Sequence, residues 1–336
     1  MKRTVIRGTG RYVPPRVVTN ADLTQWMDTS DEWIRQRTGI EQRHWVPEEG
    51  GVGSSDLGLE ASKIAIERAG WDPESIDLII FATLSPDIYF PGPGCLLQHK
   101  LGLKKTTPAL DIRQQCSGFL YGLTIADAFI RSKMANRILF VGAEVQSTAI
   151  NCCTEGRDIA VIFGDGAGAV CLEGVETDEP VGILATSIHA QGEFATALMI
   201  EAPSHKHNPY INEEMIKQGR HHPFMDGRTV FKSAVRLLTQ VAKEILEETG
   251  LSKDDIDLYI PHQANLRINQ AFARLLDLPE EKVFNNIQRY GNTTAASIPI
   301  ALDEALEMNL IDRDSTVLFL GLGSGLTWGG VAYRFA

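Results

Sequence analysis

The sequence lacks the cysteine pattern of a disulfide-bonded or zinc-binding protein. Its five cysteines are an odd number, and no two of them form a Cys-x-x-Cys pair. In a chain of 336 residues an unpaired set of this kind favours a reducing compartment, so we expect the protein in the cytoplasm. A structural zinc site has no support either, and we expect no bound metal.

Long apolar runs and an excess of positive charge are also missing. No window approaches 18 consecutive apolar residues, so we expect no membrane span. The first residues, MKRTVIRGTGRYVPP, contain no apolar core before the first glycine and proline, so we expect no secretory signal. The 32 Lys and Arg are outnumbered by 43 Asp and Glu, and the formal charge of −11 argues against general nucleic-acid binding.

The chain contains an internal repeat. The segment AGWDPESIDLIIFAT (69–83) aligns without gaps on TGLSKDDIDLYIPHQ (249–263), and RILFVGAE (137–144) aligns on TVLFLGLG (316–323) at almost the same offset. Two matches at nearly one offset indicate a duplicated unit, so we expect two similar halves, 1–178 and 179–336.

Within each half, helix and strand patterns alternate. The helix-period runs DLGLEASKIAIERAG and FKSAVRLLTQVAKEILEETG both end at glycine and precede buried strands. Each half also closes with AVIFGDGAGAVCLEG or VLFLGLGSGLTWGGVAYRF, which we interpret as two strands around a glycine-rich turn. Apolar strands that alternate with helices predict an α/β fold with buried sheets.

One segment, from about 190 to 228, breaks this pattern. It is polar, lacks sustained periodicity and contains four of the eight histidines, whose spacing fits no standard metal site. We interpret it as an insertion that lies over the second half.

Three polar side chains fall at strand ends of the duplicated pattern. Cys116 follows the third strand of the first half, and His262 follows the second strand of the second half. In the second half, the layout of 283–306 resembles that around Cys116 and places Asn292 at a strand end. If the halves pack with pseudo-twofold symmetry, all three side chains lie near the seam, where α/β sheets form ligand sites.

Cys116 itself permits two interpretations. At a helix N-terminus the thiolate is favoured, and the small residues Ser117 and Gly118 permit close approach of a ligand. Alternatively, Cys116 is a buried small hydrophobe, the commoner fate of free cysteines. Likewise, His262 alone is a surface histidine and Asn292 alone a turn residue.

Together, several motifs resemble one known family. They are DEWIRQRTGI near the start, CSGF at Cys116, FGDGAGA at 163–169, PHQAN, YGNTTAASIP, and LTWGG near the end. The whole chain resembles a β-ketoacyl-[acyl-carrier-protein] synthase III of the thiolase-like condensing enzymes. The resemblance implies a thiolase-like fold, with two duplicated α/β halves in a layered α-β-α-β-α arrangement.

The resemblance also implies a reaction. Cys116 would take an acyl group from acyl-CoA as a thioester, and His262 and Asn292 would stabilise the enolate formed when a malonyl-carrier loses CO2. The carbanion would attack the acyl-enzyme and give a 3-ketoacyl-carrier, which initiates fatty acid biosynthesis. The backbone amides of Cys116 and Ser324 would form an oxyanion hole, and no cofactor is implied.

Binding residues follow from the same resemblance. The set implied for coenzyme A is Trp33, Arg37, Arg157, Gly227 and Asn265.

Further residues are implied for protein partners. Arg267, with Lys232 as a weaker candidate, would belong to a basic patch for the acidic carrier protein. Phe90 would cross a homodimer interface into the partner's acyl pocket. Without the resemblance, Trp33 is an ordinary half-buried tryptophan, Arg37 and Arg157 are solvated arginines, and Phe90 is a core phenylalanine.

The chain departs from the family in ways that affect the acyl primer. It has Gln114 and Gln115 where small residues are common, GLGSG at 321–325, and the long 190–228 segment. We expect acetyl-CoA as the primer, with a longer acyl-CoA or a role in secondary metabolism as alternatives, and we hypothesise that the insertion shapes the acyl tunnel.

Two other classes remain as rivals. A papain-like hydrolase has the order Cys, His, Asn, but its local cysteine signature is absent and it has no repeat. A catalytically silent interaction protein would be expected to lose one of the three residues. Thiolase chemistry, which needs a second cysteine, fits less well than decarboxylative condensation.

Overall fold

A computed structural model describes residues 1–336 and contains two main sheets. The first has the order β1-β7-β6-β4-β5 and the second the order β11-β12-β13-β8. The strands of the first are β1 (Lys2–Tyr12), β4 (Leu78–Ala82), β5 (Ala109–Ile112), β6 (Arg137–Glu144) and β7 (Gly166–Glu176). Those of the second are β8 (Gly182–Ala190), β11 (Leu258–Pro261), β12 (Thr316–Gly323) and β13 (Thr327–Arg334).

The two sheets repeat one pairing pattern. In the first, β4 and β6 are parallel, and β6–β7 and β7–β1 are antiparallel. In the second, β11 and β12 are parallel, and β12–β13 and β13–β8 are antiparallel. Strands β6 and β12 coincide with the aligned segments 137–144 and 316–323. The duplicated α/β halves expected from the repeat are therefore confirmed.

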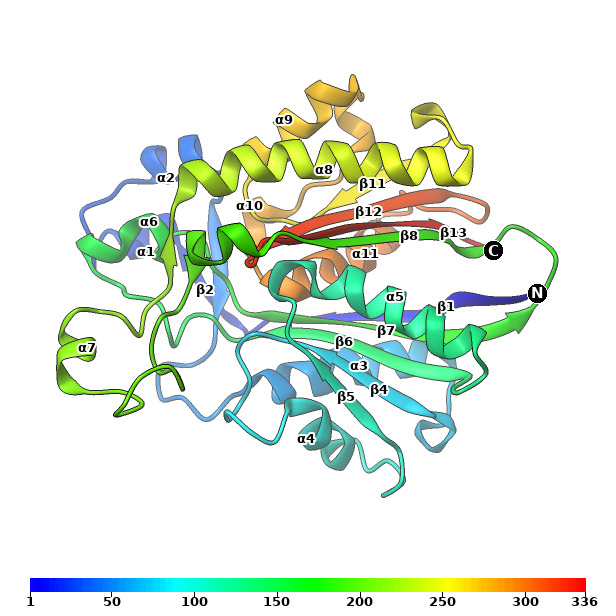
Figure 1. Ribbon diagram of the computed structural model, residues 1–336, viewed down its shortest axis with the longest axis horizontal. Coiled ribbons are helices and arrows are strands. Elements are labelled where there is room, and N and C mark those ends of the chain that lie inside the picture. Colours follow the sequence, from blue (N-terminus) through cyan, green and yellow to red (C-terminus); the bar gives the residue numbers. More distant parts are fainter.

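The helices form three layers around the two sheets (Figure 1). Helices α3 (Ser54–Ala69) and α4 (Pro93–Lys100) cover the outer face of the first sheet, and α8 (Gly227–Thr249) and α9 (Leu266–Leu276) cover the second. Between the sheets lie α5 (Gly118–Arg131) and α11 (Ser297–Glu307). This is the predicted α-β-α-β-α arrangement.

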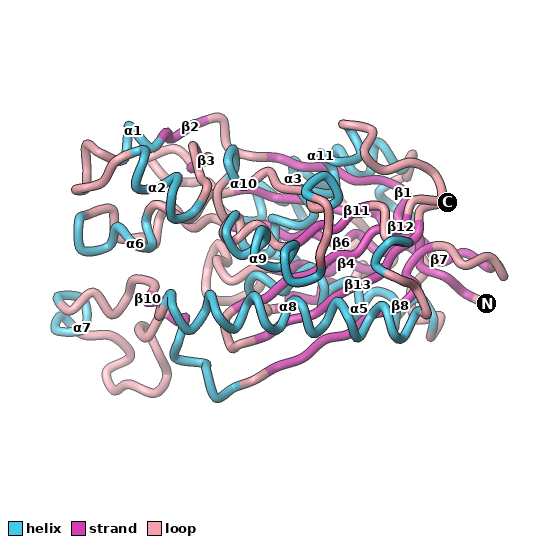
Figure 2. The backbone as a smooth tube through the Cα atoms, turned by 90° about the horizontal axis from the view of Figure 1, so that it is seen from above, coloured by secondary structure: helices cyan, strands magenta, loops and turns pink.

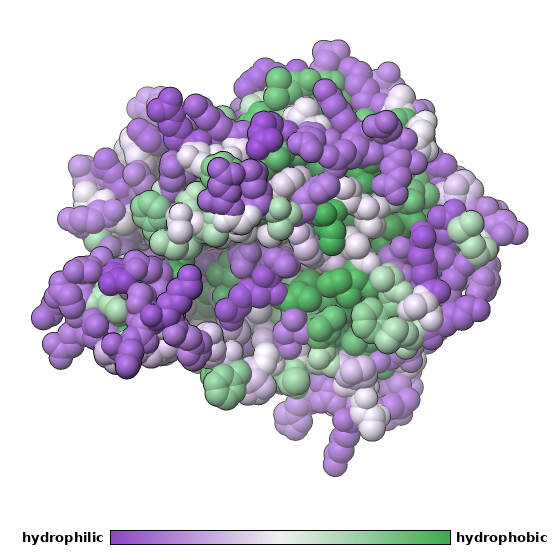
Figure 3. Space-filling view, in the orientation of Figure 1, coloured by the Kyte–Doolittle hydropathy of each residue, from purple (hydrophilic) through white to green (hydrophobic).

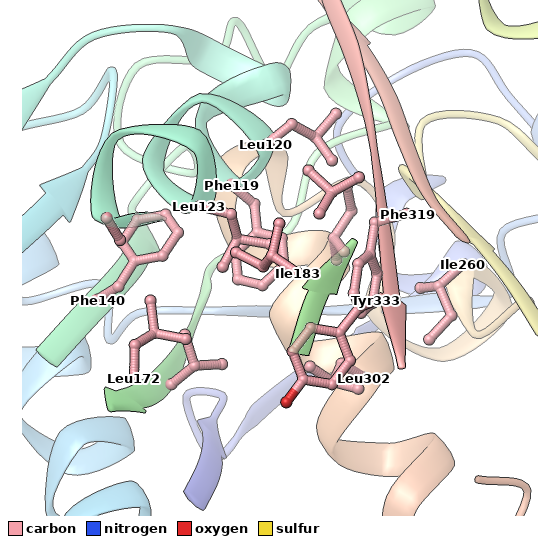
Figure 4. Packing of buried hydrophobic residues seen from close by; sticks show 14 of the residues in the cluster. Phe119, Leu120, Leu123, Phe140, Leu172, Ile183, Ile260, Leu302, Phe319 and Tyr333 are labelled. Carbon is pink, nitrogen blue, oxygen red and sulfur yellow. The ribbon is translucent and has the colours of Figure 1, made fainter. Parts of the chain in front are cut away.

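The middle layer forms the largest hydrophobic core. Figure 4 shows Phe119 and Leu120 of α5, Phe140 of β6 and Phe319 of β12 meeting between the two sheets. The rings of Phe119 and Phe140 stack with centroids 5.3 Å apart. Because these residues are fully buried, the start of α5, which follows Cys116, is fixed rigidly between the halves.

The outer helices have the ends that their sequences predict. Helix α3 ends at Gly70 (φ 63°) and α8 ends at Gly250 (φ 70°), and both glycines adopt the left-handed conformation of a helix C-cap. Helix α8 begins after Asp226, whose carboxylate accepts a hydrogen bond from the amide of Thr229. None of the helices combines the length and hydrophobicity needed to cross a membrane.

Smaller elements form a cap at one end of both sheets, on the left of Figure 1. Strands β2 (Arg16–Thr19) and β3 (Gln42–Trp45) pair with each other, near helices α1 (Asn20–Leu23), α2 (Asp31–Thr38), α6 (Arg157–Ala160) and α10 (Ile287–Tyr290). Their apolar residues share one cluster that includes Ile34, Trp45 and Ile287.

Two predicted strands are wrong. Residues 160–163 do not pair in a sheet; they end α6 and pack their apolar side chains into the cap. The stretch from 283 does not repeat β5, because Val283 makes only an isolated bridge to Tyr259 and α10 follows. Asn292 consequently follows the short helix α10 instead of a strand, and it makes an isolated bridge to Phe163 itself.

The 190–228 segment contacts both halves, not only the second. It contains a 3-10 helix (Gly192–Ala197), β9 (Leu198–Met199), α7 (Glu213–Lys217) and β10 (Phe224–Met225), and Figure 2 shows α7 far from the sheets. The Ser324 hydroxyl donates to the Leu198 carbonyl, whereas His222 Nδ1 lies 2.8 Å from the Ala149 carbonyl oxygen.

Candidate active site

Cys116 lies in a tight turn between β5 and α5. Residues Gln115–Ser117 form one turn of 3-10 helix, in which Gln115 has φ 44°, and α5 starts at Gly118. A side chain at Gly118 would fit only tightly, because an added Cβ would lie 3.1 Å from the Ala82 side chain and 3.2 Å from that of Ala295. The turn therefore places the thiol at the seam of the two halves, where it lines a cavity of about 600 Å³.

His262 lines the same cavity from the second half. It follows β11, and its amide donates to the Leu320 carbonyl. Its Nδ1 lies 2.5 Å from the Ser297 hydroxyl, and its buried Nε2 has no partner within the protein. Burial lowers the pKa of His262 to about 3, so the ring is neutral at physiological pH.

Asn292 is the third side chain in this cavity. Its Oδ1 accepts a hydrogen bond of 2.8 Å from the amide of Thr294, a residue with φ 46°. Its backbone is held by hydrogen bonds with Ile162 and Gly164. Because Oδ1 is occupied, the Nδ2 group remains as a donor for a ligand.

All three side chains are buried: Cys116 is 6% exposed, His262 4% and Asn292 5%. The interpretation of Cys116 as a packing residue alone does not account for its place in the cavity wall beside two polar side chains. A buried imidazole nitrogen and an amide group that point at a thiol-lined cavity provide donors for a developing oxyanion.

The expectation that the helix N-terminus favours a Cys116 thiolate is wrong for the resting protein. Burial, together with the charge of Glu144, raises the pKa of the thiol to about 12. The thiol is therefore protonated at neutral pH and needs a base. The neutral His262 is a base in the same cavity.

The backbone amides expected for an oxyanion hole lie in the turn between β12 and β13 and in the Cys116 turn. Neither Cys116 nor Ser324 donates its amide to a carbonyl oxygen of the protein. An added Cβ at Gly323 would lie 3.0 Å from the Cys116 nitrogen, so these two backbone segments are in close contact. A larger residue at 323 would separate them.

At the mouth of the cavity, two arginines lie over one tryptophan ring. The guanidinium carbons of Arg37 and Arg157 are 4.4 Å and 5.1 Å from the centroid of Trp33. Arg157 also donates to the Asp28 carbonyl, and Arg37 lines the cavity. The sequence prediction that brought these three residues together agrees with this geometry.

The other residues expected to contact coenzyme A also lie at the mouth. Gly227 is the first residue of α8, and an added Cβ there would meet only the end of the Met225 side chain, at 3.9 Å. Asn265 has less freedom, since its Oδ1 accepts from the Arg267 amide and its Nδ2 donates to the Arg37 carbonyl. Its amide thus ties α9 to the end of α2.

Basic residues surround this mouth. Arg267 and Lys232 both line it, and the Arg267 guanidinium lies 5.7 Å from the centroid of the Phe231 ring. Arg228, which the sequence analysis missed, lines the mouth as well. Its position in the first turn of α8, one turn before Lys232, is the signal that could have identified it.

Family models match two parts of the chain. Residues 110–192 match 3-oxoacyl-[acyl-carrier-protein] synthase III, and residues 246–335 match the C-terminal part of the same enzyme. A crystal structure of the synthase III from Aquifex aeolicus is 43% identical, with a TM-score of 0.89 over 99% of this chain and 100% of that one. This chain belongs to the 3-oxoacyl-[acyl-carrier-protein] synthase III family.

Other solved structures are similar over the full length. The Thermus thermophilus enzyme is 38% identical, with a TM-score of 0.90 over 99% of both chains. The priming β-ketosynthase of the R1128 polyketide pathway is 31% identical, with a TM-score of 0.89 over 99% of this chain and 96% of that one. The fold is thus thiolase-like, and the protein is a condensing enzyme of the acyltransferase type.

In this chain, Phe90 is not a core residue. It is 80% exposed, and its neighbours Ile88 and Tyr89 are 51% and 56% exposed. This loop lies near the end of the edge strand β5, since the guanidinium carbon of Arg113, which follows β5, is 5.7 Å from the centroid of the Tyr89 ring. Figure 3 shows apolar residues gathered in the middle of the face over α5 and β5.

Sequence reasoning missed the supporting residues of the site. Ser297 and Thr294, which hold His262 and Asn292, gave no signal beyond the motif that contains them. Arg43 is also buried, without an acidic partner, and donates to the carbonyls of Val18 and Val161. It ties β2 to the cavity wall. No group of three or more potential metal ligands is present.

Proposed function

We propose that the protein condenses an acyl-CoA primer with a malonyl-[acyl-carrier protein] and releases CoA and CO2. The product is a 3-ketoacyl-[acyl-carrier protein], the first intermediate of fatty acid synthesis. One observation carries the proposal: Cys116, His262 and Asn292 line one buried cavity, with His262 Nε2 unpartnered.

In the first half-reaction, Cys116 Sγ attacks the carbonyl carbon of the acyl-CoA. The thiol proton passes to His262 Nε2, and the amides of Cys116 and Ser324 stabilise the oxyanion. The C–S bond to CoA then breaks, and the CoA thiolate takes the proton from His262. The acyl group remains on Cys116 as a thioester.

In the second half-reaction, the bond between the malonyl Cα and its carboxylate breaks. The electron pair forms an enolate, whose oxygen accepts hydrogen bonds from His262 Nε2 and Asn292 Nδ2. The enolate carbon then attacks the acyl carbonyl, the bond to Cys116 breaks, and the released thiolate takes up a proton. His262 therefore accepts a proton first and donates a hydrogen bond later.

The Ser297 hydroxyl supports both roles of His262. When Nδ1 carries a proton, it donates to the Ser297 oxygen, and Nε2 is free to accept the thiol proton. When the Ser297 hydroxyl donates to Nδ1 instead, Nε2 carries the proton and acts as a donor. One rotatable hydroxyl thus serves both tautomers.

Coenzyme A fits the mouth if the adenine stacks on Trp33. An adenine between two flanking groups needs about 7 Å, two contact distances of about 3.5 Å. Arg157 lies only 5.1 Å from the Trp33 centroid, so its guanidinium must move outwards when the nucleotide binds. There it can pair with a phosphate, as can Arg37.

The carrier protein approaches the same mouth. The patch of Arg267 and Lys232, extended by Arg228, provides positive charge for an acidic partner in a protein with a net charge of −11. We further propose a homodimer in which the exposed Phe90 loop and the free edge of β5 meet the partner. In this arrangement Phe90 completes the partner's acyl pocket.

The primer is proposed as a short acyl-CoA. Leu198 and Met225, from the 190–228 segment, line the cavity with Phe163 and Leu322, which supports a role of this segment in acyl-chain selection. A priming role in secondary metabolism is a second candidate, because a polyketide priming ketosynthase is 31% identical. We therefore expect deletion of the 190–228 segment to change the acyl-chain preference, and an unchanged preference would contradict this role.

Intact mass of the purified protein tests the function. The protein is exposed to acetyl-, butyryl- or octanoyl-CoA, and malonyl-carrier is added afterwards, with Cys116→Ala as the control. We expect a short-chain adduct on Cys116 that disappears when malonyl-carrier is added. No adduct from any acyl-CoA would contradict the proposal, and a preference for octanoyl-CoA would indicate the specialised role.

A further inference from the structure

A buried carboxylate, Glu144, lies near the Cys116 turn, and apart from its effect on the pKa of the thiol it has no part in the chemistry described above. Glu144, the last residue of β6, is completely buried and has no arginine, lysine or histidine partner. Burial raises its pKa. A buried carboxylate without a cation is costly unless hydrogen bonds compensate it, so its position calls for an explanation.

The groups around Glu144 are hydrogen-bond donors. On one side, the hydroxyls of Thr83 and Ser85 donate at 3.0 Å and 2.5 Å, and the amides of Leu84 and Ser85 donate at 3.2 Å. The side-chain amide of Gln146 donates at 3.2 Å. An environment made only of donors suits the ionised carboxylate.

The opposite side of the carboxylate contacts the second half of the chain. Glu144 Oε1 accepts a hydrogen bond of 3.4 Å from the amide of Ala295. This residue follows Thr294, whose own amide holds the Oδ1 of Asn292. Glu144 is therefore joined to the catalytic amide through one short turn, residues 293–295.

That turn has little freedom apart from these bonds. Thr294 has φ 46°, a conformation that a β-branched residue rarely adopts and that its surroundings must maintain. An added Cβ at Gly142, two residues before Glu144, would lie 2.6 Å from the Ala295 carbonyl oxygen. The end of β6 thus packs closely against the turn at Gly142 and accepts a hydrogen bond from it at Glu144.

We propose that Glu144 is a positioning residue: its buried carboxylate holds the 293–295 turn, and through it the Asn292 amide, in the geometry required for decarboxylation. This inference rests on the proposed function. It predicts that the two half-reactions respond differently, because Asn292 serves only the second.

Glu144→Gln tests the inference. The glutamine is nearly isosteric but presents an NH2 group to the donors around it. Because the charge of Glu144 helps to raise the pKa of the Cys116 thiol, its loss should not slow the acylation of Cys116, which intact mass measures. Release of labelled CO2 from malonyl-carrier by the acylated enzyme should fall about tenfold or more, through kcat and not KM.

Two further variants separate positioning from a general loss of stability. Gly142→Ala pushes on the same turn without a change of charge, and it should also lower CO2 release more than acylation. Asp127→Asn is the matched control, a mostly buried carboxylate that accepts from Thr4 and Arg131. It lies in α5 roughly 16 Å from Cys116 along the chain, at 1.5 Å per residue, and should affect neither half-reaction selectively.

Glu144→Asp restores the charge with a shorter reach and should recover part of the lost CO2 release. The inference is overturned if Glu144→Gln and Gly142→Ala change both half-reactions equally or leave both unchanged. It is also overturned if the aspartate variant behaves like the glutamine variant. Failure of the unchanged protein to release CO2 would overturn the proposed function itself, and the role of Glu144 with it.

Discussion

The two halves of the molecule share a scaffold but differ in one strand. In the first half, β5 pairs with β4 and forms a free sheet edge before the chain turns to Cys116. In the second half, the equivalent stretch is reduced to the bridge between Val283 and Tyr259, and the chain continues through α10 to Asn292. The two copies of the duplicated unit thus differ: one has a free sheet edge and Cys116, and the other has His262 and Asn292.

Under the proposed function, this difference separates the nucleophile from the groups that bind the enolate. The first half carries the thiol that forms the acyl-enzyme, and the second carries His262 and Asn292, of which only His262 also acts in acyl transfer. The following predictions test whether the division holds, beginning with the largest effect.

The thiol of the first half should titrate far from the physiological range. Burial and Glu144 raise the pKa of Cys116 to about 12. Below this pH, the thiolate fraction therefore increases about tenfold with each increase of one pH unit. Alkylation of Cys116 by iodoacetamide should therefore accelerate about a thousandfold between pH 7 and 10. Site-resolved mass spectrometry measures this rate, and a plateau below pH 9 would contradict the expectation.

Asn292→Ala should separate the halves functionally. Loss of one donor to the enolate oxygen should lower malonyl-dependent CO2 release about a hundredfold or more. Acylation of Cys116 should be nearly unchanged, because Asn292 has no part in that step. An equal loss in both steps would show that the division between the halves is wrong; Cys116→Ala, which should abolish acylation, calibrates the assay.

Phe90→Asp should weaken the proposed dimer about tenfold to a hundredfold, since a charge replaces an aromatic ring at a buried contact. Analytical ultracentrifugation over a range of concentrations measures the effect. Leu310→Asp is the control, since Leu310 is 45% exposed and follows α11, which packs on β1 and β7 away from the β5 edge. Equal effects of both variants would rule out the β5 edge as the interface.

Trp33→Ala should have the smallest effect, about a fivefold increase in KM for acyl-CoA, because stacking at a partly exposed site contributes about 1 kcal/mol. The rate at saturating acyl-CoA should not change. A fall in kcat without a change in KM would place Trp33 outside the nucleotide site.

Much of the scaffold could be predicted because its signals are local. The strands β4 and β11 are short apolar runs, and α3 and α8 end at glycines that mark helix C-termini. The same reasoning failed at 160–163, since a short apolar run that is buried in a loop cannot be distinguished from a strand by its pattern.

The candidate catalytic side chains could be identified from the sequence and the structure places them in one cavity, but the residues that support them could not be identified. Cys116, His262 and Asn292 lie in recognisable motifs, whereas the contacts of Glu144 and Ser297 join residues from distant parts of the chain. The protonated state of Cys116 was mispredicted for a related reason. Helix position is visible in the sequence, but burial beside a carboxylate from β6 is not.

Asn265 joins two sides of the cavity mouth. Its side chain caps α9 by accepting from the Arg267 amide, and it donates to the backbone carbonyl of Arg37. Under the proposed function, the residues for coenzyme A and those for the carrier protein are therefore neighbours at one entrance, where we expect only one of the two ligands at a time. Under the proposed function, turnover is ordered by space: free CoA must depart before the carrier enters, the steady-state kinetics follow a ping-pong pattern, and accumulated CoA competes with the carrier.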